Sequence, residues 1–232
     1  MKDKIKKLKF IHITKTAGTA IEELGILFNV KWGRHDKDIE LLTSHLEYIQ
    51  DKAFWHVPTI YYNLELLHKI KEKYDFFLIV RNPYDRVISE CYCKWGGYKS
   101  KHFEKFYKLK INENSSNDNI NKWINMRLNH LKELLEKNKY LVNGHWNPHY
   151  LYIYDSTGKS IVKKNNVIHF ENLENELNEL FKRYNTNIDY LKAPEINKNK
   201  KKFKIEDLSI KNIKLINEIY HKDFKLFGYK KI

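Results

Sequence analysis

The pattern of hydrophobic and polar positions along the 232 residues predicts strands that alternate with helices. Short apolar runs at 8–13 and 76–80 are typical of strands, and the second run, FFLIV, resembles a strand buried inside a parallel sheet. Apolar residues elsewhere recur every three or four positions, which is typical of amphipathic helices. We expect helices near 20–28, 64–73, 83–92, 120–135, 173–184 and 209–224, strands at 151–154 and 167–170, and irregular chain at 32–62 and 112–119.

This order of elements predicts an α/β fold with a central parallel sheet and helices on both of its faces. The length suits a single domain over residues 1–232, because a chain of this size buries about 70% of its unfolded surface without disulfides or metals. No internal repeat or long linker divides the sequence.

The first apolar run leads into a glycine-containing loop that opens a helix. Backbone N–H groups lack partners at the start of a helix, and the helix dipole adds partial positive charge there. Lys15 adds a mobile charge, and Thr16 and Thr19 add hydroxyl donors. Gly18 lets the backbone approach an anion closely. We predict a phosphate-binding loop at 14–19, with an ordinary strand-to-helix turn as the alternative.

The spacing of this loop differs from that of the ATP-binding loop G-x-x-x-x-G-K-[ST], because its lysine comes early and the first glycine is missing. The FFLIV run ends in Arg81 rather than in a carboxylate that would hold Mg²⁺. A P-loop enzyme of phosphoryl transfer is therefore an alternative that lacks its metal ligands. A third hypothesis is a non-enzymatic basic module that binds nucleic acid or sulfated glycans.

A second motif begins where the FFLIV run ends. Arg81 follows that strand, at the edge where ligands bind in open α/β sheets, and its guanidinium can hold a phosphate through two hydrogen bonds. The Asn-Pro pair after it is typical of a helix N-cap and first residue, which places Ser89 about two turns into the helix. Asp85 and Arg86 favour an ion pair at the helix start.

The segments FIHITKTAGTA and FFLIVRNPYDRVIS resemble the two signatures of sulfotransferases that use 3′-phosphoadenosine 5′-phosphosulfate (PAPS). The resemblance implies a fold like that of the P-loop NTPases. It implies that Arg81 and Ser89 hold the 3′-phosphate, which ATP lacks, and that PAP is the product. It also implies that the 5′-phosphosulfate is bound by Lys15, Thr16, Ala17, Gly18 and Thr19.

Later segments, GHWNPHYLYIYD, VIHFENLENELNELFKRY and IYHKDFKLFGY, resemble the carbohydrate branch of these enzymes, which includes chondroitin, dermatan and heparan uronyl sulfotransferases. That branch implies a hydroxyl acceptor on a glycan. Its members carry a membrane anchor and often disulfides, whereas this sequence has no apolar run near 18 residues and no signal-peptide core. We therefore expect a cytoplasmic enzyme without a membrane or nucleic-acid partner.

Transfer to a hydroxyl needs a base, and a histidine titrates in the right range. Among eleven histidines, His56 fits the His-x-Pro form that related sulfotransferases carry before the arginine motif, and His45 is the second candidate. His145 is interpreted as substrate-side or structural, and His12 as a core residue. Lys15 would stabilise charge on the bridging oxygen, so no metal is predicted for this chemistry.

Composition changes this picture little. The net charge of +14 suits a polyanionic partner, but the abundance of Lys, Asn and Ile equally suits codon bias. The basic loop 198–204, with Lys200, Lys201 and Lys202, falls where relatives cover their cofactor, although a solvated loop explains it almost as well.

The cysteines and tryptophans leave their roles open. Cys91 and Cys93 stand two apart with no histidine cluster beside them in the sequence, which predicts neither a disulfide framework nor a zinc site. Four tryptophans outside the helical stripes could stack on sugar rings or pack in the core: Trp32, Trp55, Trp95 and Trp146.

Overall fold

The computed structural model describes residues 5–46, 53–100, 109, 111–112, 114–137, 139, 143–194 and 203–232. These residues form two compact units. The first contains the described residues up to 81, together with 143–144 and 149–194. The second contains those from 82 to 139, together with 145–148 and 203–232. The chain thus leaves the first unit and returns to it, so neither unit is one continuous segment.

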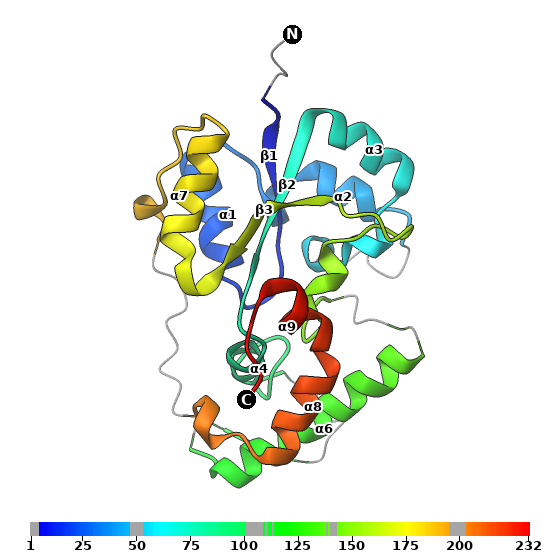
Figure 1. The fold of residues 1–232 in the computed structure, drawn as a ribbon, viewed down its shortest axis with the longest axis vertical. Coiled ribbons are helices and arrows are strands. Elements are labelled where there is room, and N and C mark those ends of the chain that lie inside the picture. Colours follow the sequence, from blue (N-terminus) through cyan, green and yellow to red (C-terminus); the bar gives the residue numbers. More distant parts are fainter. Residues whose placement is uncertain are drawn as a thin grey trace. The chain divides into compact units, whose positions relative to one another are not determined.

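The first unit is built on a parallel sheet of β1 (Lys7–Ile11), β2 (Tyr74–Val80) and β3 (Val162–His169), with β2 in the middle (Figure 1). The residues of β2 from 76 to 80 are all buried, as predicted from the unbroken apolar run. Because the strands are parallel, their carboxyl ends share one edge of the sheet, and the loops that follow all three strands leave from that edge.

Helices cover both faces of this sheet. Figure 1 shows α1 (Gly18–Leu27) and α7 (Leu173–Arg183) on one side, and α2 (Lys37–Thr43) and α3 (Leu64–Lys73) on the other. The predicted α/β class with a covered parallel sheet is therefore confirmed. The core beneath α1 and α7 is formed by Leu8, Phe10, Ile21, Leu24, Trp32, Phe77, Ile79, Ile168, Leu173, Leu177, Leu180, Phe181 and Ile188.

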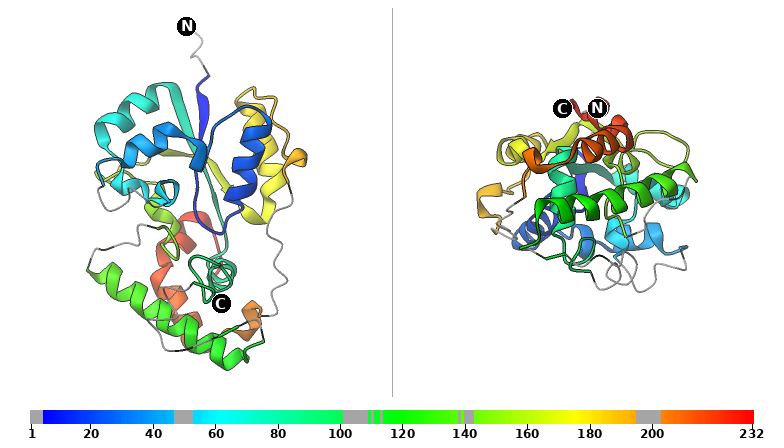
Figure 2. Two further views of the ribbon diagram at one scale, coloured as in Figure 1. Left: turned by 180° about the vertical axis from the view of Figure 1, so that it is seen from behind. Right: turned by 90° about the horizontal axis from the view of Figure 1, so that it is seen from below.

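The second unit is helical among its described residues, with α4 (Pro83–Cys91), α6 (Asn117–Glu136), α8 (Ile210–Ile219) and α9 (His221–Phe227) (Figure 2). The α4 helix begins as predicted, because the Asn82 side chain accepts the N–H of Tyr84 and a proline occupies the first turn. Its predicted inner face, with Val87, Ile88, Cys91 and Tyr92, lies in a core shared with α6, α8 and α9.

Four sequence predictions need correction. Residues 151–154 are not a strand, because η5 (His149–Tyr152) is a 3-10 turn whose short apolar run is buried. The helix predicted at 209–224 is two helices, because α8 ends at Ile219 and α9 begins at His221. The loop predicted at 112–119 becomes helical at Asn117, since Ser116 caps α6. The stretch 32–62 is not irregular throughout, because it contains α2. The remaining 3-10 turns are η1 (Gly33–His35), η3 (Phe54–His56), η4 (Thr59–Tyr61), η6 (Phe170–Asn172), η7 (Tyr190–Lys192) and η8 (Ile205–Asp207).

Candidate functional site

The loop after β1 has an unusual backbone. Lys15 and Ala17 both have left-handed conformations, with φ of 66° and 67°, which side-chain-bearing residues adopt at a cost. Such alternation turns successive N–H groups toward one concave side, which is a common anion-binding arrangement. Among the described residues no side chain caps the start of α1, and its first turn carries no acidic residue. The positive end of α1 therefore faces the loop without an acidic residue in its first turn.

The hydroxyl groups of this loop differ in their engagement. Thr16 is buried and donates its hydroxyl to the carbonyl of Ile13 at 2.8 Å, so its side chain braces the loop. Thr19 is half-buried in the first turn of α1. Lys15 is half-buried and forms no ion pair with any described side chain. A mobile cation thus accompanies the backbone donors.

Gly18 is required by the packing of His12 behind the loop. A Cβ atom at position 18 would lie 2.0 Å from the His12 ring. The Nδ1 of that ring lies 2.7 Å from Glu22 Oε1, and both side chains are buried. Because an ionised carboxylate only accepts hydrogen bonds, Nδ1 carries the proton and Nε2 faces the glycine side. His12 is buried, as the interpretation as a core residue predicted, and it also packs against Gly18 of the loop.

Burial and charge oppose each other at Glu22. Burial raises the pKa of this carboxyl. The hydrogen bond and charge of His12, together with the backbone N–H and guanidinium of Arg34, lower it by more than burial raises it. The pKa of Glu22 therefore lies below its ordinary value. The Arg34 N–H donates to Glu22 Oε1 at 2.9 Å. The carboxylate is therefore ionised and holds the imidazole in one orientation.

His56 lies next to this pair. It ends η3, and its ring meets the His12 ring edge-on, with 4.5 Å between the centroids. The Tyr152 hydroxyl donates to the His56 carbonyl at 3.0 Å, and a Cβ at Gly144 would lie 2.4 Å from that carbonyl. Gly144 and Tyr152 thus fix the backbone of His56, while His12 lies between the His56 ring and Gly18 of the loop.

Arg81 follows β2 at the carboxyl edge of the sheet and reaches the same loop. Its Nη1 donates to the Lys15 carbonyl at 3.3 Å, and its guanidinium lies 4.2 Å over the ring of Phe170, just after β3. Segments after all three strands therefore meet at Arg81. The structure brings together Arg81, the loop and His56 within one unit.

Other predicted site residues lie elsewhere. Ser89 is buried on α4 in the second unit, so its partnership with Arg81 stays a prediction. His45 is exposed after α2. Residues Lys200, Lys201 and Lys202 lie outside the described residues, as does most of the 198–204 loop.

The second unit contains a buried polar cluster at the end of α4. Arg86 donates to the Asn147 carbonyl at 2.5 Å and lies 3.6 Å from Glu90, so the partner found for it is Glu90 rather than the predicted Asp85. His145 Nδ1 lies 2.7 Å from Glu90 Oε2. Burial lowers the pKa of His145, but the charge of Glu90 and the hydrogen bonds that His145 makes with Cys93 and Glu90 outweigh it and raise the pKa to about 9.

The environment of the cysteines corrects one expectation. Both are free thiols, as predicted, but a histidine does lie near Cys93. Donor atoms of Glu90, Cys93 and His145 all lie within 4.8 Å of one another. The sequence separates the histidine from the cysteine, so spacing alone could not reveal this group.

The tryptophans divide by exposure. Trp32 and Trp146 are buried core residues. Trp55 is half-buried with its ring centroid 5.5 Å from that of His56, whereas Trp95 is 71% exposed. Only the half-buried ring accompanies the candidate site.

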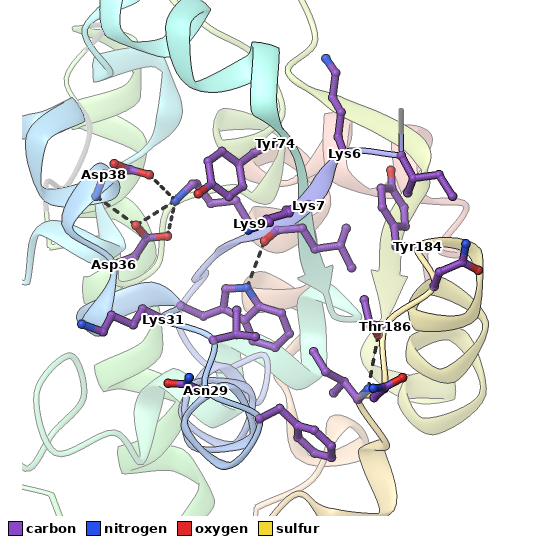
Figure 3. A pocket seen from close by; sticks show the side chains of 18 of the residues that line it. Lys6, Lys7, Lys9, Asn29, Lys31, Asp36, Asp38, Tyr74, Tyr184 and Thr186 are labelled. Carbon is purple, nitrogen blue, oxygen red and sulfur yellow. Dashed lines mark hydrogen bonds and ion pairs between the residues drawn. The ribbon is translucent and has the colours of Figure 1, made fainter. Parts of the chain in front are cut away.

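A hollow of about 720 Å³ lies at the opposite, amino-terminal edge of the sheet. Figure 3 shows Lys9 pointing to Asp36 and Asp38 there, at 2.7 and 2.8 Å. Its strand residues come from the starts of β1 and β2, and none of the predicted site residues lines it. Because ligands of open α/β sheets bind at the carboxyl ends of strands, we assign the site to the loop edge.

Comparison with known proteins identifies the class. The model of the sulfotransferase family matches residues 1–230, which is nearly the whole chain. No curated protein and no solved structure matches the chain significantly. The chain belongs to the sulfotransferase family and is an enzyme of sulfuryl transfer. This assignment replaces the phosphoryl-transfer and non-enzymatic interpretations. Among the described residues, no helix is long and apolar enough to span a bilayer.

Proposed function

We propose that the enzyme transfers a sulfuryl group from PAPS to a hydroxyl of a carbohydrate. The observation that carries the proposal is the loop of residues 15–19, with two left-handed residues and an uncapped helix start beside Arg81. A dianionic donor fits this place because backbone N–H groups, a helix dipole and two cations converge there without an acidic neighbour in the first turn of the helix.

Two sets of residues would bind the two charged ends of the donor. PAPS supplies an activated sulfuryl group on its 5′-phosphate, and its 3′-phosphate distinguishes it from ATP. The backbone of Ala17, Gly18 and Thr19 would hold the 5′ group, with Lys15 stabilising negative charge on the leaving oxygen. Arg81 and Ser89 would hold the 3′-phosphate. Arg81 donates to the Lys15 carbonyl, so its guanidinium lies beside the loop that would hold the 5′ group.

His56 is proposed as the general base. Its position beside His12 supports this role, because the His12 ring packs against Gly18 of the donor loop. The Tyr152 hydroxyl and Gly144 fix the backbone of His56, so its ring needs little reordering to accept a proton from the acceptor hydroxyl. The ionised Glu22 orients His12 and thereby the surface against which His56 rests.

A glycan acceptor is supported by features of the chain rather than by a bound sugar. Trp55 presents a half-buried ring next to His56, and aromatic faces suit sugar rings. The net charge of +14 favours acidic glycans over neutral alcohols. The segments that resemble the carbohydrate branch include Gly144 and Tyr152, the two residues that hold His56.

Donor binding tests the first part of the proposal. Isothermal titration without Mg²⁺ should show that PAP binds and that ATP binds more weakly. Arg81→Ala should lower PAP affinity about tenfold to a hundredfold, because a charge-assisted phosphate contact is lost. Arg183→Ala, which changes an exposed arginine, is the matched control and should leave affinity unchanged. Preference for ATP, or an unchanged affinity in Arg81→Ala, would overturn the donor assignment.

Turnover tests the base. His56→Ala should lower kcat by about 10² to 10⁴ while PAP affinity stays constant, because a general base acts only in the transfer step. His45→Ala changes the exposed second candidate and should retain full activity. A large loss in His45→Ala with none in His56→Ala would transfer the role to His45.

A further inference from the structure

The group formed by Glu90, Cys93 and His145 has the composition of a metal site. Glu90 lies in the last turn of α4, Cys93 follows two residues after that helix, and His145 enters from a turn far along the chain. One ligand atom from each lies within 4.8 Å of the other two, and all three residues are buried. A thiolate, an imidazole and a carboxylate together form a ligand set typical of zinc.

The distance between His145 and Glu90 requires only a small adjustment. His145 Nδ1 and Glu90 Oε2 are 2.7 Å apart, as in a hydrogen bond. Ligand atoms around a tetrahedral zinc ion stand about 3.3 Å apart, given bonds of about 2.0 Å. An opening of roughly half an ångström would therefore turn this contact into one edge of a coordination tetrahedron.

Neighbouring residues hold the side chains of Glu90 and His145 in orientation. The second carboxylate oxygen of Glu90, Oε1, faces the Trp146 N–H at 3.5 Å and Arg86 at 3.6 Å, which directs Oε2 toward His145. Gly96 leaves room for the imidazole, since a Cβ there would lie 2.4 Å from the ring. Outer contacts of this kind hold metal ligands in place in known sites.

We propose that Glu90, Cys93 and His145 bind one zinc ion that stabilises the second unit. The three side chains leave one of zinc's four positions for a water molecule. Binding forms Zn–S and Zn–N bonds in place of S–H and N–H bonds, and the protons pass to solvent. None of the three ligands is itself assigned to the proposed donor site, although Ser89 directly precedes Glu90 on α4. The zinc proposal does not depend on the proposed function.

A simpler interpretation is a buried ion pair between Glu90 and His145, with Cys93 as a neighbour. An ion pair needs two partners, whereas the thiol adds a third donor in reach of both. The two interpretations differ in whether the thiol of Cys93 becomes a thiolate bound to metal, which can be observed directly.

Cobalt(II) is the probe, because its complexes with thiolates absorb in the near ultraviolet and tetrahedral cobalt absorbs strongly in the visible. The full chain, first treated with chelator, is titrated with Co²⁺ and then with Zn²⁺. We expect both bands, saturation at one ion per chain, and displacement by zinc. Absence of the thiolate band at stoichiometric cobalt would overturn the proposal.

Variants assign the ligands. The chain has two cysteines, so Cys93→Ser should abolish the thiolate band and Cys91→Ser should keep it. Glu90→Gln and His145→Asn should weaken cobalt binding at least tenfold. A band that survives in Cys93→Ser, or is lost in Cys91→Ser with retained helical signal, contradicts the assignment. X-ray absorption at the zinc edge of the wild-type protein, expected to show one sulfur ligand, decides the matter if Cys93→Ser does not fold. None of these readouts uses PAP or an acceptor, so their failure would leave the sulfotransferase proposal standing.

Discussion

Each unit of this enzyme holds a buried pair of imidazole and carboxylate, and the two pairs have the same internal geometry. His12 and Glu22 in the first unit, and His145 and Glu90 in the second, are each 2.7 Å apart from Nδ1 to oxygen. In each pair the histidine side chain is 7% exposed and the carboxylate 1%. Because the two pairs have the same distance and the same burial, any difference between them must come from their surroundings.

The surroundings of the two pairs differ. Glu22 is supported by Arg34, a side chain that is 34% exposed, and its histidine packs against the donor loop. Glu90 is supported by Arg86, a side chain that is 2% exposed, and its histidine has the thiol of Cys93 as neighbour. One pair therefore packs against the loop after β1 and lies beside a partly exposed cation, whereas the other compensates a deeply buried cation.

The difference between the two pairs is tested most directly by removing one carboxylate charge at a time and measuring the loss of stability. Glu90→Gln should destabilise the protein by about 3 to 5 kcal/mol, because two buried cations lose their compensation. Glu22→Gln should cost less, about 1 to 2 kcal/mol, because Arg34 remains partly solvated. Urea unfolding of both variants in chelator measures the difference, with Glu→Gln at the exposed Glu65 as the control. Equal losses would show that burial of the second cation does not matter.

The two pairs should lose their contributions to folding stability at opposite ends of the pH scale. The folded pKa of His145 is raised from an ordinary value near 6.5 to about 9, so its contribution is complete below about pH 6.5 and is lost as pH rises through about 9. The folded pKa of Glu22 is lowered, so its contribution is complete above about pH 4.5 and is lost as pH falls through its folded pKa.

The alkaline loss is on the order of 3 kcal/mol, and unfolding free energies of chelator-treated protein across the pH range will measure it. Glu90→Gln should flatten the alkaline side, and Glu22→Gln the acid side. A wild-type profile without an alkaline decline, or one that Glu90→Gln leaves unchanged, would contradict this assignment.

A further test concerns the glycines that face the two imidazoles. Gly18→Ala and Gly96→Ala introduce a Cβ at 2.0 and 2.4 Å from the His12 and His145 rings, and should each cost about 1 to 3 kcal/mol. His12→Ala in the same chain should recover part of the Gly18→Ala loss, because the overlap is then relieved. Losses that simply add would show that the ring is not what the glycine accommodates.

Sequence periodicity predicted most of the fold. The unbroken FFLIV run fits a buried strand, and the long apolar stripes of α6 and α7 fit only helices. It failed at 151–154 because four apolar residues fit a strand and a buried 3-10 turn equally well, and only packing decides. The helix α2 was missed because its seven residues are too few to show a clear period.

The candidate site could be predicted where its residues are contiguous or follow a strand, as for the 15–19 loop and Arg81. The contacts of His12 with Glu22 and Gly18 were not predicted, although the place of His12 between β1 and the loop was one signal for them. Glu22, next to Ile21 on the buried side of α1, was a second one. The contact of Glu90 with His145 joins residues 55 positions apart, and no local pattern predicts such a contact.

The order of the strands also has a consequence for biosynthesis. The central strand β2 pairs with β1 on one side and with β3 on the other, and β3 is made only after residues 82–137 of the second unit. On the ribosome, one edge of β2 therefore stays unpaired while these residues are synthesised. Sheets closed by such distant partners fold slowly and are prone to association, so the emerging chain should depend on chaperones until Val162 has left the exit tunnel.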